Sequence, residues 1–167
     1  LFTLMGLPLS HGAMALDSDR DQPIQIVADV AVRDELAGKT RYEGNVVLTQ
    51  GSLVITADTL SIHHNTDEAD KIVATGKPAT LLQQPTPDQA PVDASALRIE
   101  YIRSRDLVRL LEDARIAQDG STLSGRQIDY LVSQRTVRAA GTPGAEETGR
   151  VEVVIPPENL RGNASDG

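Results

Sequence analysis

The stretch NVVLTQGSLVITADTLSI, residues 45–62, alternates apolar and polar side chains in the way typical of two β-strands joined by a turn at Gly51. The pattern recurs 68 positions later as DARIAQDGSTLSGRQIDY, residues 113–130. The segment that follows also recurs, since IVATGKP at residues 72–78 resembles VRAAGTP at residues 137–143. Repetition of short alternating segments favours stacked β-units over a catalytic domain of irregular design.

Fainter copies flank the repeat. IVAD at residues 26–29 resembles ITAD at residues 55–58, and ASALRI at residues 94–99 resembles ADTLSI at residues 57–62. We therefore expect about four units, each of two strands and two turns, between residues 24 and 155.

Two breaks in the alternation predict where strands bend or end, and one segment needs a choice between helix and strand. The phase changes near Asp58, which predicts a bulge or bend. Gly76-Lys77-Pro78 interrupts a second strand, because proline cannot donate to a ladder. Residues 105–118 have leucines near helical spacing, but the repeat pairs this segment with a strand-like one, so we predict a strand. The chain is therefore predicted to be all-β.

Turns and loops are expected at four polar segments, residues 34–39, 63–70, 85–91 and 142–147. The clearest is 85–91, with three prolines in seven residues, which divides the two halves of the repeat. Residues 151–155 are the last predicted strand, and residues 156–167 are predicted to be a disordered tail.

The N-terminus differs from the rest of the chain. Residues 1–9 are apolar and uncharged, and Ala13-Met14-Ala15 has the A-x-A pattern of a signal-peptide cleavage site. The apolar run is too short to span a bilayer. We therefore interpret residues 1–15 as the remnant of a signal peptide, and residues 16–155 as one exported domain.

Composition excludes several classes of function. The 167 residues carry a net charge of −8 with scattered basic residues, which argues against nucleic acid as a partner. Cysteine is absent, so no disulfide stabilises the fold and no thiol takes part in chemistry. Outside the N-terminal segment the aromatic residues are Tyr42, Tyr101 and Tyr130. An interior of Val, Ile, Leu and Ala suits alkyl chains, although an ordinary aliphatic core would have the same composition.

Two clusters of polar residues have simple structural explanations. His63 and His64 are adjacent, so on a strand they would point to opposite faces, and we interpret them as part of a solvated turn. Five arginines lie close together in the sequence, at Arg98, Arg103, Arg105, Arg109 and Arg115. A solvated strand face explains them most simply. Contact of some of them with phosphates of a ligand is the alternative.

Both ends of the predicted sheet are open to pairing. Residues 24–32 and 151–155 form its first and last strands, and neither segment carries lysine or an interior proline to block an approaching strand. We therefore expect assembly through these edges.

Four motifs in order carry a family resemblance: DQPIQI at 21–26, GNVVLTQG at 44–51, ITAD at 55–58 and GKPAT at 76–80. Over residues 21–155 the chain resembles the LptA (OstA-like) family of periplasmic lipopolysaccharide-transport bridge proteins. It departs from the family in its proline-rich segment at 85–91 and in having leucine at Leu81 and Leu82, where aromatic residues are common. These departures affect the expected shape of the lipid-binding groove and leave the expected function unchanged.

The resemblance implies a twisted antiparallel β-jelly roll of about sixteen short strands, open at both ends, with no enzymatic activity and no cofactor. It implies a periplasmic protein that carries lipopolysaccharide and stacks head to tail. An LptC-like, inner-membrane-anchored subunit would pair with the N-terminal edge. An LptD-like outer-membrane translocon, or another copy of the chain, would pair with the C-terminal edge.

Alternation and position in the repeat predict which side chains line an apolar groove for the acyl chains of lipid A. They are Ile24, Ile26, Val46, Leu48, Ile55, Leu60, Leu81, Leu97, Ile99, Tyr101, Ile116, Leu123 and Tyr130. Plain core packing is the alternative for each.

Two other functions compete with a lipid carrier. A carbohydrate-active β-helix enzyme would need clustered inward carboxylates, which the alternation does not predict. A structural or adhesive β-repeat protein would share the repeats and the edges but would have a filled interior.

Overall fold

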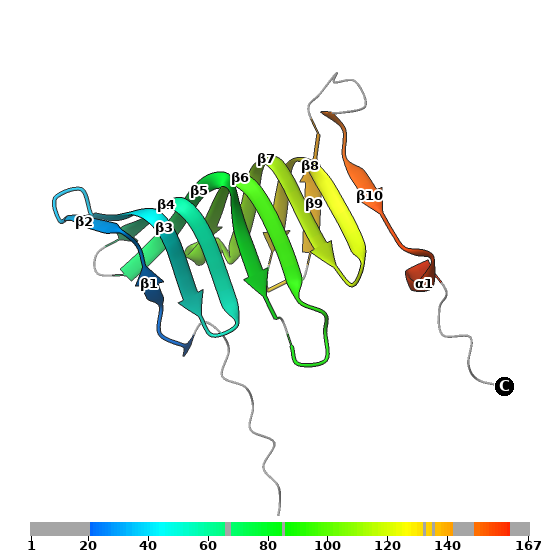
Figure 1. Cartoon of the computed structure of the whole chain (residues 1–167), viewed down its shortest axis with the longest axis horizontal. Coiled ribbons are helices and arrows are strands. Elements are labelled where there is room, and N and C mark those ends of the chain that lie inside the picture. Colours follow the sequence, from blue (N-terminus) through cyan, green and yellow to red (C-terminus); the bar gives the residue numbers. More distant parts are fainter. Residues whose placement is uncertain are drawn as a thin grey trace, which may run out of the picture.

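The computed structural model describes residues 21–65, 68–84, 86–131, 133–134, 136–141 and 149–160. Within these residues a single antiparallel sheet of ten strands runs the length of the molecule (Figure 1). The strands are β1 (Gln25–Val27), β2 (Val30–Asp34), β3 (Lys39–Gln50), β4 (Leu53–Asn65), β5 (Glu68–Gln83), β6 (Val92–Ile102), β7 (Leu107–Gln118), β8 (Ser121–Leu131), β9 (Thr136–Ala140) and β10 (Glu152–Val154). A 3₁₀ turn covers Arg103–Arg105, and α1 covers Pro157–Leu160. No helix in the described part of the chain is both long and apolar enough to cross a membrane.

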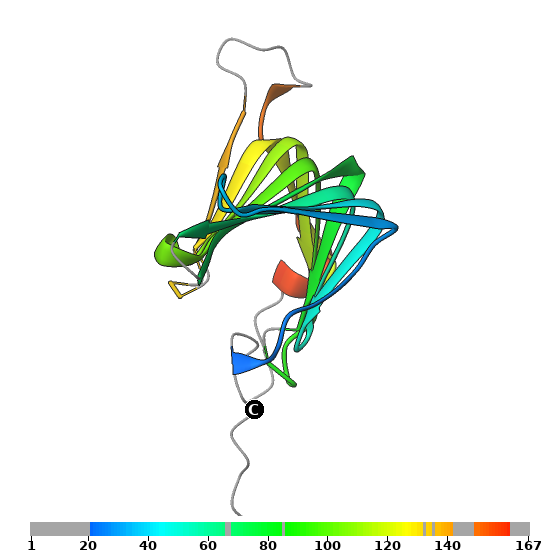
Figure 2. The same cartoon turned by 90° about the vertical axis from the view of Figure 1, so that its left-hand side faces the viewer.

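Bulges divide each of the six long strands into two halves. A register shift interrupts every pairing between β3 and β8 near mid-strand. The halves form two limbs of an arch, which Figure 2 shows from one end. The first limb contains β1, β10 and the ends of the long strands that pair with them, residues 46–50, 53–57, 79–83, 92–96, 114–118 and 121–125. The second limb contains β2, β9 and residues 39–43, 59–65, 68–75, 98–102, 107–111 and 127–131.

Positive backbone φ angles mark the bulges of β3 and β7. Gly44 and Asn45 have φ of 78° and 47°, and Glu112 and Asp113 have φ of 63° and 52°. Asn45 and Asp113 are the first residues of the two copies of the repeat, so the repeat in the sequence corresponds to two hairpins bent at the same place. Glycine, asparagine and aspartate tolerate this conformation best, which explains three of the four residue types.

Small residues line the inside of the bend. Ala57 pairs with Val46, Ala79 with Ala96, and Ala114 with Gly125. Their short side chains let the two limbs converge there, whereas larger side chains fill the space between the limbs farther out. The predicted bend near Asp58 is confirmed, because Ile55 and Leu60 are both buried although the spacing between them is odd.

The predicted all-β jelly roll is confirmed. The strand predicted over residues 105–118 is confirmed for residues 107–118, whereas Arg105 belongs to the 3₁₀ turn. Counting both halves of β3 to β8 and adding the four short strands gives sixteen segments, in agreement with the expected number. The loop at 85–91 lies between β5 and β6. The predicted signal-peptide remnant 1–15, the start of the domain and the turn at 142–147 lie outside the described residues.

Three local predictions are wrong. The predicted turn at 63–70 is shorter, since β4 continues through His63 and His64 to Asn65 and β5 begins at Glu68. The predicted first strand divides into β1 and β2 at the bend. Part of the predicted disordered tail is ordered, because Pro157–Leu160 form α1, which is held by hydrogen bonds from the Asn159 Nδ2 amide to the Asp119 carbonyl and the Ser121 hydroxyl.

Gly44→Ala is expected to destabilise the fold by about 1–3 kcal/mol, since a Cβ would disfavour the positive φ. The added methyl group would also overlap the Asp29 carboxylate. Chemical denaturation measures the loss, with the exposed corner variant Asp58→Ala as the control, expected to change stability by less than about 0.5 kcal/mol. Equal stability of the two variants would contradict this account of the bulge.

Candidate functional site: the interior between the two limbs

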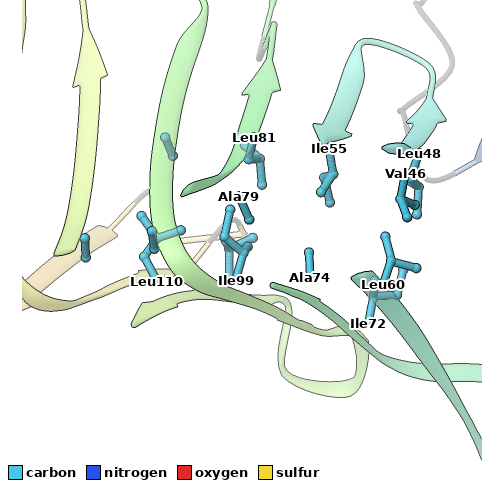
Figure 3. Close-up of a cluster of buried hydrophobic side chains, with 14 of the residues drawn as sticks. Val46, Leu48, Ile55, Leu60, Ile72, Ala74, Ala79, Leu81, Ile99 and Leu110 are labelled. Atoms are coloured by element: carbon cyan, nitrogen blue, oxygen red, sulfur yellow. The ribbon is translucent and has the colours of Figure 1, made fainter. Parts of the chain in front are cut away.

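Apolar side chains form two continuous rows along the inside of the arch. On the first limb, paired residues run across eight strands: Ile26, Leu48, Ile55, Leu81, Ala94, Ile116, Leu123 and Val153. On the second limb the corresponding row is Tyr42, Leu60, Ala74, Ile99, Leu110, Ile128 and Ala139. Figure 3 shows side chains of the two limbs pointing toward one another, such as Ile55 and Leu81 from one and Leu60 and Ile99 from the other.

The middle of this interior is filled by protein side chains. Leu48 and Ile128 are 0% exposed and Ile99 is 1% exposed. Apart from Val153, the residues of the two rows belong to one hydrophobic cluster, so the limbs pack against each other directly. At about 25 cal/mol per Å² of buried apolar surface, this contact is a main source of the stability of the fold.

The interior opens to the surface toward both ends of the stack. Near β1, a cavity of about 250 Å³ lies between Gln22, Ile24 and Gln50 of the first limb and Asp70, Ile72, Tyr101 and Arg103 of the second limb. Toward β10, a wider depression of about 670 Å³ brings together Ile116 of the first limb, Val137 of the second limb and Asn159 of α1. The interior is therefore closed in the middle and accessible at both ends.

Most of the predicted lining residues face the interior. Eleven of the thirteen belong to the hydrophobic cluster: Ile26, Val46, Leu48, Ile55, Leu60, Leu81, Ile99, Tyr101, Ile116, Leu123 and Tyr130. Ile24 lies instead at the mouth of the cavity near β1. Contact of any of these residues with lipid stays a prediction.

Leu97 is the exception, since it is not part of the hydrophobic cluster. It borders an outer depression together with Arg115, Ser124 and Glu152. The fainter repeat aligned Leu97 with Leu60, whereas in the sheet Leu60 shares its row with Ile99. The copy is therefore offset by two residues, because Ala96 rather than Ala94 occupies the bend.

Sequence reasoning left several inner residues off the list, namely Tyr42, Ile62, Ile72, Ala74, Ala79, Ala94, Ala96, Val108, Leu110, Ala114 and Ile128. The same alternation would have found most of them once the bulges were placed, since residues such as Ala74, Leu110 and Ile128 lie in the same row as the predicted Leu60 and Ile99.

Ion pairs cover the outer face of the second limb. The Arg109 guanidinium donates to both carboxylate oxygens of Asp129 at 2.8 Å. Glu100 is 2.9 Å from the Lys71 Nζ and 2.6 Å from the Arg98 guanidinium. Of the five neighbouring arginines, Arg98 and Arg109 thus form ion pairs within the protein.

These contacts lower the pKa of both carboxyl groups. Hydrogen bonds from Arg109 lower the pKa of Asp129, although burial acts in the opposite direction. Burial raises the pKa of Glu100, but hydrogen bonds and charge from Lys71 and Arg98 outweigh it, so the net shift is downward. A folded-state pKa below the unfolded value stabilises the fold above the unfolded pKa, near 4 for both acids, and this contribution is lost as pH falls through the folded pKa.

Asp129→Asn is therefore expected to reduce the free energy of unfolding by about 1 kcal/mol at pH 7. Below about pH 4 the stability of this variant should decrease less than that of the wild-type protein. Denaturant unfolding at pH 7 and pH 3 measures both effects, with the exposed Asp58→Asn variant as the control. The same loss of stability at both pH values would contradict this assignment.

The two histidines lie on β4, where it pairs with β3 and β5. No group of three or more potential metal ligands occurs among the described residues. His64 Nε2 is 3.2 Å from the Thr40 hydroxyl, a hydrogen bond between neighbouring strands. Burial lowers the pKa of His63, with the charge of Lys39 acting in the same direction. Both residues are accounted for by the strand pairing.

The comparisons with known proteins agree with this geometry. The family described as "LptA/(LptD N-terminal domain) LPS transport protein" matches residues 25–136. The chain belongs to this family. It is 35% identical over 162 residues to the lipopolysaccharide export system protein LptH of Pseudomonas aeruginosa, covering 95% of this chain and 93% of the relative. It is 32% identical over 163 residues to LptA of Escherichia coli K12, covering 96% of this chain and 85% of that protein.

A solved structure of the same family has the same fold. The crystal structure of LptH, described as the LptA-homologous periplasmic component of the lipopolysaccharide transport device of Pseudomonas aeruginosa, superposes with a TM-score of 0.77 at 35% identity. The match covers 84% of this chain and all of the LptH chain. The fold expected from the resemblance to the LptA family is thus confirmed.

The open edges of this LptA-family sheet are apolar. Val27, Val30 and Val32 on the N-terminal strands are 52–59% exposed, and Val153 and Val154 on β10 are 57% and 51% exposed. Among the large apolar side chains recorded as exposed, only Val47 and Leu82 lie in the inner strands β3 to β8. Exposed apolar strands with unpaired backbone groups are typical of sites for strand addition.

Proposed function

We propose that this chain carries lipopolysaccharide across the periplasm, holding the acyl chains of lipid A between the two limbs of the arch. The two rows of apolar side chains, which reach from one open edge to the other, are the observation that carries the proposal. The relatives named as lipopolysaccharide export proteins support it.

The packed interior implies how lipid would enter. Each buried CH₂ contributes about 0.8 kcal/mol, so an acyl chain moves readily only between apolar surroundings. Lipid would replace contacts between the limbs, and it would begin at the two accessible ends. Since the interior is apolar along its whole length, the free energy of an acyl chain changes little from one end to the other. The force for directed transport must therefore come from a partner.

Strand polarity supports assembly at both edges. The chain runs through β1 and β2 from the first limb to the second, and through β9 and β10 from the second to the first. A second copy added head to tail would therefore extend the sheet with antiparallel pairs on both limbs. We propose that the N-terminal edge also accepts an LptC-like inner-membrane-anchored subunit and that the C-terminal edge accepts an LptD-like translocon.

The packed middle of the interior favours one alternative, a structural β-repeat protein that assembles through its edges and binds no lipid. A carbohydrate-active enzyme is disfavoured, because both inner rows are apolar and the buried Glu100 is bound to Lys71 and Arg98. We propose no catalytic activity for this chain.

Co-elution with lipopolysaccharide separates carrier from structural protein. The purified protein is incubated with lipopolysaccharide and passed over a sizing column, and lipid A in the protein peak is measured by mass spectrometry. Stoichiometric lipid A is expected. A folded protein that elutes without lipid, as an unrelated periplasmic β-protein should, would favour the structural alternative.

Photo-crosslinking in cells locates the lipid. Adjacent residues face opposite sides of a strand, so Leu48 and Val47 form a matched pair: Leu48 is buried and pairs with Ile26, whereas Val47 is 37% exposed and pairs with Val27. A photo-reactive residue is expected to capture lipopolysaccharide at Leu48 or Ile26 and not at Val47 or Val27. Capture at both faces, or only at the outer one, would place the lipid elsewhere.

A further inference from the structure

The cavity near β1 combines an apolar floor with a cation at its rim. Ile72 and Tyr101 belong to the hydrophobic cluster of the interior, so the cavity borders the packed contact between the limbs. Ile24 closes the opposite side and is 40% exposed, which leaves an apolar side chain at the mouth. Arg103 lines the same cavity from the 3₁₀ turn that follows β6.

Arg103 differs from Arg98 and Arg109 in its ion pairing within the described residues. No ion pair joins it to another residue of the described part of the chain, although Arg98 and Arg109 both have carboxylate partners. A guanidinium group presents paired N–H donors that match the oxygens of a phosphate. A free guanidinium beside an apolar cavity therefore suits an amphiphile whose phosphate lies next to its alkyl chains.

We propose that Arg103 binds a phosphate on the headgroup of an acylated lipid whose alkyl chain enters the cavity between Ile24, Ile72 and Tyr101. The inference rests on the proposed function and adds a polar contact to an otherwise apolar route. It makes the cavity near β1 a portal that recognises phosphorylated lipid before the chains reach the closed middle of the interior.

Asp70 lines the same cavity, and its negative charge is expected to oppose phosphate binding. Its carboxylate repels a phosphate, so removing its charge should strengthen binding where removing Arg103 weakens it. Arg105 lies in the same turn and is also exposed, but it does not line the cavity. Changes at Arg103 and Asp70 are therefore expected to shift the affinity for phosphorylated lipid in opposite directions, and a change at Arg105 is expected to leave it unchanged.

The test uses the full chain and two probes, lipid A with both phosphates and the same lipid after enzymatic dephosphorylation. Arg103→Gln is expected to weaken binding of the phosphorylated lipid by about 3- to 10-fold and to leave the dephosphorylated lipid unchanged. Asp70→Asn should tighten the phosphorylated lipid only, and Arg105→Gln should change neither. Ile24→Ser should weaken both lipids equally, since it removes apolar contact.

Several outcomes would overturn the inference. Wild-type affinity of Arg103→Gln for phosphorylated lipid would do so, as would an equal loss for both lipids. Displacement of the lipid by inorganic phosphate at equal concentration would identify a site for the free ion instead. If the wild-type chain binds neither lipid, the proposed function itself is contradicted. If it binds both lipids and Arg103→Gln has no effect, only the phosphate-binding role of Arg103 is contradicted. Thermal unfolding of each variant confirms that it is folded.

Discussion

Ile99→Asp is expected to unfold the protein. Ile99 is 1% exposed at the centre of the second limb, and its side chain points toward the first limb (Figure 3). A carboxylate there would be buried without a partner, at a cost of about 3–5 kcal/mol or more beyond the lost packing. This is a large fraction of the roughly 5–15 kcal/mol that stabilises an ordinary domain. Loss of the cooperative transition in thermal circular dichroism is the measurement.

Leu123→Asp makes the informative comparison, because it carries the same chemical change to a more accessible part of the interior. Leu123 is in the inner row of the first limb next to β10 and is partly exposed. This variant is expected to remain folded and to retain less than about a tenth of the lipid in the co-elution assay, since the charge interrupts the apolar row. Full lipid capture by a folded Leu123→Asp variant would mean that the row does not carry the acyl chain.

Val32→Lys is expected to weaken head-to-tail association by about 10-fold or more, since lysine on an edge strand opposes pairing. Val32 begins a row on the outer face that runs through Arg41, Glu100 and Asp129 to Arg138 on β9. If a second copy continues this row, its Val32 lies beside Arg138, and a lysine there meets a like charge. Analytical ultracentrifugation over a concentration series measures the change.

The double variant Val32→Lys with Arg138→Glu tests the register directly. Opposite charges across the new pair are expected to restore association, whereas Arg138→Glu alone should have a small effect. Val47→Lys is the matched control, because Val47 is also an exposed outward valine but its strand is paired on both sides. Equal weakening by Val32→Lys and Val47→Lys would indicate that surface charge, rather than the edge, governs association.

Local alternation placed eleven of the thirteen predicted residues correctly in the interior. Side chains two apart on a strand share a face, so a buried residue such as Leu48 identifies its neighbour Val46 without knowledge of the partner strand. The repeat added the equivalence of Asn45 and Asp113, which the positive φ angles confirm. Leu97 is not part of the hydrophobic cluster. The strand bends there, and the fainter repeat matches Leu60 equally well when it is shifted by two residues, so alternation alone could not choose between Leu97 and Ile99.

Four features followed from the order of residues alone: the all-β class, the repeated hairpins, the open edges and the family. These depend on side-chain period and on short motifs, which are local properties of the chain. Three features became visible in the folded molecule. The limbs pack together in the middle, the interior opens at both ends, and Arg103 and Ile24 line one cavity. The physical reason is that the bulges in β3, β5 and β7 act together: they fold one sheet onto itself, and so bring into contact residues that no local pattern relates.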